Sequence, residues 1–592
     1  MSTVQTRGPD WVGNAPDIVL PAAGKTVRRR PSLFDVVSIG VVAALAFLAL
    51  YPLARIAIRL FFTGEGGGAA ALAVYGQPGT WVVISNTVIV VAASGMLSLA
   101  IGSALAWINE RTDARIGVLT DIVPLLPFLV PPIAGAIGWV LLLSDRAGFV
   151  NAVLRWALGL FGVEMTRGPL NIYTWGGLIF VYTVYAVPYV YLVVSAGLRN
   201  VDSALEEQSR ICGNGLLRTM AKVTIPAVRP ALGGAALLIV WFGFSLFSVP
   251  AIIGTGAKIE VLPVRLVRLV TFTYPPDMAG AIGLGLVVLL AVGTAWMLQL
   301  KVLSKGRFAT VSGKGSRTVT IELGAWRPVA RSVIVLYMLI SAVLPLVALL
   351  LVALNGFWTP TIRWTALNFN TFREILFEDG LTLTALSNSL SLGIAGATIG
   401  IVAAAVLSLF VQRHGSAAAR AVDGLIKLPA SVSSIVLALG FVLAFSGAPF
   451  NLNGTFLILL MAYLALYMPQ ASVAADSAAA QVGRELTEAS RICGASGGRT
   501  FMRVSLPLML GGLAAGWALL FVRMISDLTA SSILAGTQNP VVGFRILEIY
   551  EGASFAGLAA LSSLLTVISC LVVGLVLVFS RRRGRGTPRS AS

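Results

Sequence analysis

Charged residues are scarce in this 592-residue chain: they make up 11% of it, whereas hydrophobic residues make up 57%. Because soluble domains carry about 25% charged residues, this composition excludes an ordinary soluble protein and indicates several membrane spans. The formal net charge is +18, but the basic residues lie in short segments between apolar runs, where membrane topology accounts for them. We therefore expect the lipid bilayer as a partner, and no nucleic acid.

Cysteine and histidine are nearly absent. Three cysteines are too few for a disulfide framework, and Cys212 and Cys493 stand at equivalent places in two similar segments, which indicates shared ancestry. The single histidine, His414, excludes a His-rich metal site, and no metal ligands are expected. A Walker-type nucleotide loop is also missing, because Val19 stands where the first glycine should precede the Gly-Lys-Thr at 24–26. We therefore expect a chain that is not an enzyme and binds no cofactor.

Long apolar runs are abundant, and a helical span needs about 20 apolar residues. The predicted spans lie near residues 36–54, 81–107, 119–143, 174–197, 231–253 and 279–300, and then near 332–353, 388–411, 425–445, 455–475, 512–535 and 556–580. The run at 119–143 is the least regular, because it contains Pro124, Pro127, Pro131 and Pro132. The expected fold is an all-α integral membrane protein of about 12 transmembrane helices.

The distribution of lysine and arginine predicts the topology. Basic clusters lie at 28–30, in 301–331 and at 581–589, and all three can be cytosolic if each half has an even number of spans. The loop at 61–80 has neither residue, as expected outside the cell. We predict five segments: a cytosolic tail at 1–33, a first six-span half at 34–300, a basic cytosolic linker at 301–331, a second six-span half at 332–580 and a basic cytosolic tail at 581–592.

The two halves repeat each other in sequence. Pairs 302 residues apart are Ser85 and Ser387, Asn86 and Asn388, Arg111 and Arg413, Asp121 and Asp423, Pro127 and Pro429, and Gly138 and Gly440. Later pairs, Tyr182 with Tyr463 and Pro188 with Pro469, are 281 residues apart, so the first half has the longer outside loop between its third and fourth spans. Equal span numbers between cytosolic ends indicate a parallel repeat, not the inverted repeat of many secondary transporters.

A polar segment occurs once in each half, between the fourth and fifth spans. Residues 206–226 read EEQSRICGNGLLRTMAKVTIP and residues 487–507 read TEASRICGASGGRTFMRVSLP. We predict a helix over 204–212, a turn at Gly213, which can take a positive φ, and a second helix over 216–222. Pro226 is expected to end that helix and reset the chain before the fifth span. The alternative is a solvated loop whose basic residues only follow the positive-inside rule.

Each copy resembles the EAA loop of ABC-importer permeases, in which Glu-Ala-Ala, three residues, Gly and nine residues precede Ile-x-Leu-Pro. The first copy has Glu207, Gly213 and Pro226 at these positions, with Gln208 and Ser209 in place of alanine. The resemblance implies docking on an ATP-binding subunit, through positions Glu207, Ser209, Arg210, Gly213, Arg218, Pro226, Glu488, Ser490, Arg491, Gly494, Arg499 and Pro507.

The resemblance covers nearly the whole chain and implies two fused permease subunits of the binding-protein-dependent, MetI-like type. The layout is most similar to that of ferric-iron permeases, with thiamine and aminoethylphosphonate permeases as alternatives. It implies two copies of an ABC ATP-binding subunit that carry ATP and Mg²⁺, an extracytoplasmic solute-binding protein, and a multi-pass place in the bacterial inner membrane with both termini cytoplasmic. An ion-coupled secondary transporter is the rival class.

Candidate residues of the translocation path are fewer. Arg523 and Asp527 fall in the eleventh predicted span, where charges are costly and often functional. The alternative is an i,i+4 pair that neutralises itself in the bundle. Other candidates are Thr529 and Ser531, for which ordinary interhelical contacts are the alternative role. Tyr182 and Tyr463 are also candidates, with interface anchoring or core packing as the alternative roles.

Overall fold

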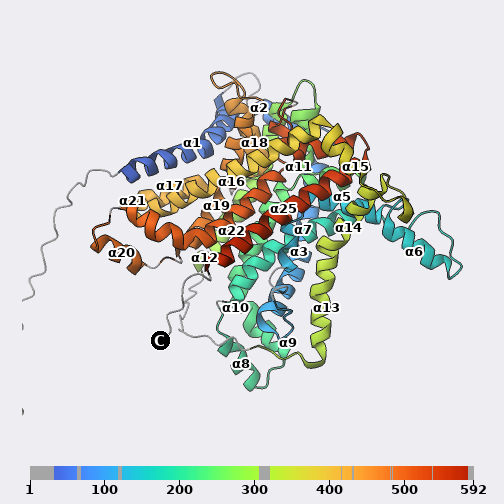
Figure 1. Cartoon of the computed structure of the whole chain (residues 1–592), viewed down its shortest axis with the longest axis horizontal. Helices are drawn as coiled ribbons and strands as arrows, with labels where there is room; N and C mark the ends of the chain where they lie inside the picture. The colour runs from blue at the N-terminus through green and yellow to red at the C-terminus, as the bar shows by residue number, and fades with distance from the viewer. Residues whose placement is uncertain are drawn as a thin grey trace, which may run out of the picture.

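The computed structural model describes residues 33–584, except 63–67, 118–119, 121–122, 200, 306–319, 415, 428, 430–431, 481, 483, 496 and 537. The predicted N-terminal tail, most of the basic linker and most of the C-terminal tail lie outside the described residues. The assignment of segment boundaries therefore stays a prediction. Every named element in the described part of the chain is helical (Figure 1).

The first half follows the predicted order of spans. Its elements are α1 (Leu33–Phe62), α2 (Gly68–Ala73), η1 (Val74–Gly76), α3 (Thr80–Arg111), η2 (Val123–Phe128), α5 (Pro132–Leu143), α6 (Phe149–Gly159), α7 (Trp175–Arg199), α8 (Ser203–Ile211), α9 (Leu216–Thr219), η3 (Met220–Thr224), α10 (Ile225–Ser245), η4 (Pro250–Gly254), α11 (Leu262–Val267), η5 (Arg268–Phe272) and α12 (Met278–Lys305).

The second half repeats this order. Its elements are η6 (Gly324–Trp326), α13 (Arg327–Met338), η7 (Leu339–Val343), α14 (Leu344–Asn355), η8 (Trp364–Ala366), α15 (Asn370–Arg373), η9 (Glu374–Glu378), α16 (Gly380–His414), α17 (Ala417–Lys427), α18 (Ser434–Phe445), α19 (Phe456–Ala480), α20 (Arg484–Ile492), α21 (Gly497–Thr500), η11 (Phe501–Ser505), α22 (Leu506–Ile525), α23 (Ser531–Leu534), α24 (Val542–Glu551) and α25 (Phe555–Gly584).

Ten helices of the described residues are long and apolar enough to cross a membrane, and two shorter apolar helices, α5 and α18, complete six per half. The continuous third span predicted over 119–143 is wrong. Pro131 has an extended backbone (φ −53°, ψ 136°), and Pro132 begins a helix of only 12 residues. The residue before a proline is pushed out of the helical region, so the chain bends here and enters the bundle as a short helix.

Matching hydrogen bonds confirm that the halves are built alike. The Asn86 side chain donates to the carbonyl of Glu260 at 3.0 Å, and that of Asn388 donates to the carbonyl of Pro540 at 3.0 Å. The two asparagines are the repeated pair of the second and eighth predicted spans. The hydroxyl next to each asparagine accepts a backbone N–H group at 2.8 Å. Thr87 accepts from Leu262 in the first turn of α11, and Ser389 accepts from Val542 in the first turn of α24. In each half, therefore, the segment that leads into α11 or α24 is held against the second span of that half, which is α3 or α16.

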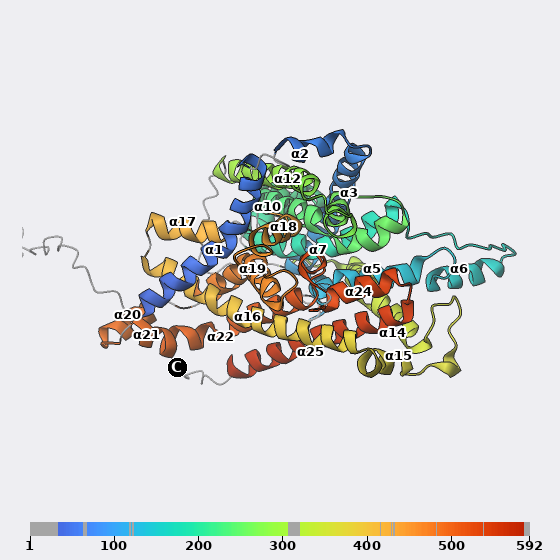
Figure 2. The same cartoon turned by 90° about the horizontal axis from the view of Figure 1, so that it is seen from above.

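The halves exchange their first spans. Helix α1 packs on α18 of the second half, and α14 packs on α5 of the first half (Figure 1, Figure 2). The repeated glycines make this possible. A β-carbon at Gly138 would lie 2.7 Å from the carbonyl oxygen of Pro345, and one at Gly440 would lie 3.0 Å from that of Pro52. One buried apolar cluster consequently runs through both halves.

Substitution of Gly138 by leucine is expected to separate α5 from α14. Overpacking of a tight core contact costs about 1–3 kcal/mol, and here the obstacle is backbone, which cannot rotate away. We expect a lower melting temperature and less monodisperse protein in mild detergent. The control is Gly293→Ala in α12, where a β-carbon meets nothing within 4 Å. Equal stability of the two variants would contradict the swapped packing.

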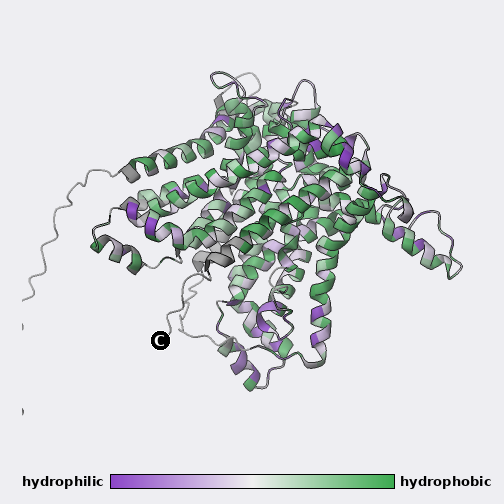
Figure 3. Ribbon diagram, in the orientation of Figure 1, coloured by the Kyte–Doolittle hydropathy of each residue, from purple (hydrophilic) through white to green (hydrophobic). Residues whose placement is uncertain are grey.

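Hydropathy follows this arrangement (Figure 3). The long helices are mostly hydrophobic along their length, and hydrophilic residues gather at α8–α9 and at α20–α21. Both polar elements lie away from α6 in Figure 1. Helix α6 belongs to the longer outside loop predicted for the first half. The two polar loops therefore lie away from the end of the bundle that carries α6.

Candidate functional site

The first EAA loop (residues 203–226) is two short helices joined at a glycine. Asp202 begins α8, because its side chain accepts the Ala204 backbone N–H at 3.0 Å. Helix α8 ends at Ile211, and Gly213 follows with φ +81°, as predicted. This conformation is open to glycine at little cost. The hydroxyls of Ser209 and Thr219 lie 3.1 Å apart and join α8 to α9.

The second EAA loop (residues 484–507) has the same geometry. Gly494 has φ +80°, and the hydroxyls of Ser490 and Thr500 lie 3.0 Å apart. The backbone N–H two residues after each cysteine donates to the carbonyl of the matching serine, from Asn214 to Ser209 and from Ala495 to Ser490, both at 3.1 Å. Ser209 and Ser490 depart from the alanine of the motif, yet each ties its loop together.

The predicted break at Pro226 is wrong. One apolar helix runs from Leu216 to Ser245, and η3, a π-helical turn over Met220–Thr224, precedes Pro226. Pro226 stands in the first turn of α10, where its missing N–H costs little. The second loop enters α22 through η11 in the same way. Each EAA loop is therefore continuous with the fifth span of its half.

The exposed surface of each loop is an apolar side chain among charges. Ile211 is 80% exposed and Ile492 is 87% exposed. The predicted docking residues Glu207, Arg210, Arg218, Glu488 and Arg499 are exposed around them, while the side chain of Arg491 lies outside the described part. Exposed apolar side chains with a charged rim are typical of protein–protein contacts.

A buried ion pair anchors the first loop to the bundle. Arg111, at the end of α3, is 3.5 Å from Glu206 of α8, and their side chains are 3% and 7% exposed. Arg111 also donates to the carbonyls of Leu198 and Val201, both at 2.9 Å. The second copy has Thr487 where the first has Glu206, so it cannot form this pair. The sequence of the second loop therefore has no counterpart of this buried ion pair.

A polar pocket of about 90 Å³ lies between the halves. It is lined by Pro132, Tyr189, Trp241, Phe242, Ser245, Leu246 and Ser248 of the first half, and by Ser434, Tyr467, Gln470, Arg523, Ser526, Asp527, Leu528 and Thr529 of the second. Of the predicted path residues, Arg523, Asp527 and Thr529 line it. Tyr182, Tyr463 and Ser531 are buried outside its lining.

The two pocket charges have separate partners. The Arg523 guanidinium donates to the Tyr189 hydroxyl at 2.5 Å and lies over the Phe128 ring, 4.9 Å from its centroid. Asp527 accepts from the Tyr467 hydroxyl at 2.8 Å and from two backbone N–H groups before and in α23. Neither side chain is the other's hydrogen-bond partner. The i,i+4 pair considered from the sequence is therefore not a direct hydrogen-bonded pair in this structure.

The sequence predicted that Asp527 lies within the eleventh span, and this prediction is wrong. Helix α22 ends at Ile525, and Ser526 leaves the helical conformation with φ −102° and ψ 8°. Asp527 then binds the backbone of the next turn, a role that short acidic side chains commonly take at helix starts. The carboxylate therefore lies at a break in the helix, beside the pocket.

Sequence reasoning missed Tyr189, Tyr467 and Gln470. Tyr189 and Gln470 each follow a proline of the repeated pair Pro188 and Pro469 in the fourth span of their half. A polar residue beside a helix irregularity that recurs in both copies is a usable signal, because a proline inside a span frees backbone groups that functional sites often use. Which residue faces the pocket still depends on the packing of the two halves.

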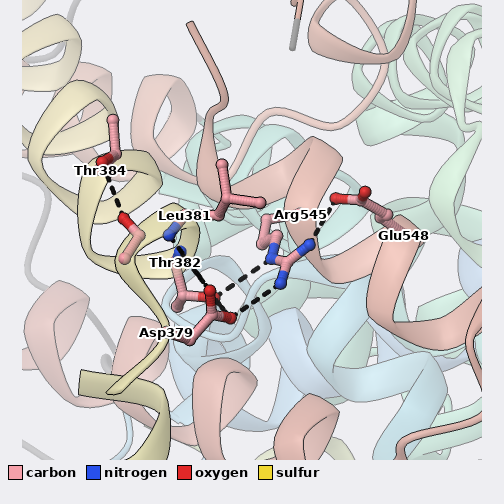
Figure 4. A network of polar contacts seen from close by, with 7 residues as sticks. Asp379, Leu381, Thr382, Thr384, Arg545 and Glu548 are labelled. Atoms are coloured by element: carbon pink, nitrogen blue, oxygen red, sulfur yellow. Dashed lines mark hydrogen bonds and ion pairs between the residues drawn. The ribbon is translucent and has the colours of Figure 1, made fainter. Parts of the chain in front are cut away.

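A second charged cluster joins α24 to the start of α16 (Figure 4). Arg545 of α24 is 2.8 Å from Asp379, which precedes α16, and 2.7 Å from Glu548. Asp379 also accepts from the hydroxyl of Thr382 at 2.5 Å. Burial alone raises the pKa of Asp379, but the bonds from Thr382 and Arg545 outweigh it, so the pKa lies below its usual value. The pair fixes α24 against the start of α16.

Asp379→Asn is expected to remove a pH-dependent part of the stability. Since the pKa is lower in the folded state, the Asp379 carboxylate stabilises the fold above the usual carboxyl pKa, and this is lost as pH falls through the folded value, below about pH 4. Melting temperatures from pH 7 to pH 3 should fall less steeply for the variant than for the wild type. Glu548→Gln, which keeps Asp379, is the control. Parallel curves for the wild type and Asp379→Asn would refute the assignment.

Two parallel six-helix halves, with an exposed EAA loop in each and a polar pocket between them, define a fused membrane permease. The chain belongs to the family of binding-protein-dependent transport system inner membrane components, which it matches twice, over residues 96–304 and 396–585. It is thus a multi-pass inner membrane permease of the ABC-importer class, whose members work with ATP-binding subunits and binding proteins.

Relatives of this chain include permeases of several named systems. It is 23% identical to the ferric transport system permease protein FbpB of Actinobacillus pleuropneumoniae, over 90% of this chain and 76% of that protein. It is also 23% identical to the putative ferric transport system permease protein FbpB 1 of Haemophilus influenzae, over 86% and 78%. The putative 2-aminoethylphosphonate transport system permease protein PhnV of Salmonella typhimurium is 23% identical over 41% of this chain and 90% of that protein.

Proposed function

We propose that this chain is the permease of an ATP-driven ferric-iron importer, and that each EAA loop docks one of two copies of an ATP-binding subunit. The observation that carries this proposal is the duplicated loop geometry, with glycines at φ +81° and +80° and isoleucines exposed at the same position. ATP and Mg²⁺ bind to the partners, and this chain binds neither and catalyses no reaction. Both termini are cytoplasmic, on the same side as the loops.

The helices support a path by which docking would move the pocket lining. Leu216–Ser245 is one helix of 30 residues, about 45 Å long at 1.5 Å per residue. In the second half, α22 begins directly after the EAA loop and carries Arg523 near its other end. A shift of either loop is transmitted along a rigid helix to the pocket lining. ATP binding drives alternating access if the partners contact the loops differently in the two states.

Iron is the favoured solute because the ferric permeases resemble both halves together, whereas the aminoethylphosphonate permease matches 41% of this chain. 2-Aminoethylphosphonate remains the second candidate on that observation. A secondary transporter would not need two equal docking loops. The external binding protein is expected to select and deliver the solute.

Native cysteines allow a direct test of the docking. Cys212 and Cys493 are exposed, one in each EAA loop, and Cys570 lies in α25. A membrane-impermeant maleimide should label Cys212 and Cys493 in inside-out vesicles only, as read by peptide mass spectrometry. Added ATP-binding subunit should protect both thiols and leave Cys570 unchanged. Labelling from the outside, or ⁵⁵Fe uptake without any ATP-binding subunit, would overturn the proposal.

A further inference from the structure

The pocket between the halves has unused hydrogen-bond donors. Arg523 has five N–H donors, and its single hydrogen bond among the described residues goes to the Tyr189 hydroxyl. The Trp241 ring N–H is buried in the same lining with no acceptor. Ser245 is 8% exposed, lines the pocket, and its hydroxyl has no partner. Buried donors without acceptors are costly, so this arrangement indicates a ligand that supplies acceptors.

The one carboxylate of the pocket lining is, by contrast, occupied. Both oxygens of Asp527 are used, one by the Tyr467 hydroxyl and the other by the backbone N–H groups of Ala530 and Ser531. The Gln470 side-chain oxygen is a neutral acceptor that lacks a partner. A cationic solute would therefore meet a guanidinium with free donors and a carboxylate that is already bound.

The pocket also does not offer a metal-binding set. No group of three or more His, Cys, Asp or Glu side chains that could hold a metal ion occurs in the ranges that the structure describes. A bare Fe³⁺ ion would be repelled by Arg523 and would find no set of anionic ligands there. A solute that presents anionic oxygens is instead attracted by Arg523, because arginine is the preferred partner of carboxylate and phosphate-like groups.

Arg523 is held so that its donors stay available. The ring of Phe128 and the ring of Tyr189 lie 4.9 Å and 5.6 Å from its guanidinium carbon. Such stacking stabilises the cation through its faces and leaves the edge N–H groups to bind in the plane. Tyr189 and Phe128 belong to the first half and Arg523 to the second, so a bound anion contacts the junction that alternating access must rearrange.

We propose that Arg523, with Trp241 and Ser245, forms an anion-recognition site in the translocation path, and that the solute passes with an anionic oxygen group facing Arg523. This rests on the proposed transport function. For an iron importer, the metal ion passes with oxyanion ligands attached. A phosphonate presents the same chemistry, so the experiment has an arm for each source.

The test uses the complete complex in proteoliposomes, with uptake of ⁵⁵Fe in phosphate buffer in one arm and of ¹⁴C-labelled 2-aminoethylphosphonate in the other. Loss of a buried charged partner weakens binding by about tenfold or more. Arg523→Gln should therefore lower uptake of the transported solute at least about tenfold, while ATP hydrolysis continues. Arg523→Lys, which keeps the charge, should restore part of it.

The stability of Arg523→Gln separates recognition from a structural role. The hydrogen bond from Arg523 to the Tyr189 hydroxyl joins the two halves, so a purely structural role predicts that the melting temperature of the complex falls together with uptake. Recognition predicts that the half-saturating solute concentration rises while the melting temperature stays near the wild-type value. If uptake and melting temperature fall together at an unchanged half-saturating concentration, Arg523 serves only to join the halves and the proposal is wrong. Wild-type uptake by Arg523→Gln would also overturn it.

A wild-type complex that transports neither solute contradicts the proposed function, and the anion site is then decided by binding. Full-length chain in lipid nanodiscs is dialysed against ³²P-labelled inorganic phosphate. Binding that is present in the wild type and lost in Arg523→Gln supports the site. Equal binding by both, or none by the wild type at millimolar phosphate, refutes it.

Discussion

Substitution of Gly494 by proline is expected to abolish solute uptake while the chain still inserts into the membrane. Gly494 has φ +80°, and the proline ring fixes φ near −65°. The turn between α20 and α21 then cannot form, and Ile492 and its neighbours cannot present the surface that the ATP-binding subunit contacts. We expect uptake to fall by about two orders of magnitude or to background, with ATP hydrolysis no longer coupled to transport.

One control for this variant lies in the same turn and the other lies in a different helix. Gly494→Asn should keep much of the activity, because asparagine tolerates positive φ better than other side chains. Gly424→Ala in α17, where a β-carbon meets nothing within 4 Å, should be silent. Uptake assays, ATPase assays and membrane yield are measured on all three variants. Normal uptake by Gly494→Pro would remove the second EAA loop from the coupling mechanism.

The glycine turns could be predicted because their cause is local. A helix with no breaker, a glycine at a fixed distance and a proline beyond it leave few alternatives, and both loops have the expected turn. The repeat could also be predicted, since it requires only that equivalent residues recur in order. The Gly138 and Gly440 match was visible in the sequence, but its reason was not: each glycine admits a proline from the other half, and hydropathy does not tell which helix a face meets.

Three features depended on tertiary structure and were not predicted. A π-helical turn precedes Pro226 and the helix continues through this residue, although a proline by itself favours a break. The apolar run at 512–535 hid the end of α22 at Ile525, because hydropathy averages over the polar residues that follow. Tyr189 became a pocket residue only once Arg523 of the other half reached it.

Because of the Arg111–Glu206 pair, we expect the first EAA loop to be more sensitive than the second to the loss of a single anchoring side chain. Both side chains are buried, at 3% and 7% exposed, and Glu206 also accepts from the Thr224 hydroxyl at 2.7 Å. This one carboxylate thus joins α3, α8 and the π-helical turn that leads into α10. The second loop lacks the carboxylate, because Thr487 takes its place. Loss of the pair should release the first loop alone.

Arg111→Met is expected to release the first loop from the bundle and to reduce uptake severely. Removing one partner of a buried pair leaves an uncompensated charge and costs about 3–5 kcal/mol, and Arg111 also holds the carbonyls of Leu198 and Val201. Amide hydrogen exchange in α8 should rise strongly, and exchange in α20 should stay unchanged, which gives an internal control in the same molecule.

The double variant Arg111→Met with Glu206→Gln separates the pair from general damage. Without the carboxylate there is no buried charge to compensate, so the double variant should be more stable than Arg111→Met alone. Together with the Glu206→Gln single variant, the two stabilities give the interaction energy of the pair. The neutral amide that Glu206→Gln introduces can still bond Thr224 and hold the turn in place. If both variants lose equal stability, or if α20 exchanges as fast as α8, the ion pair is not what anchors the first loop to α3.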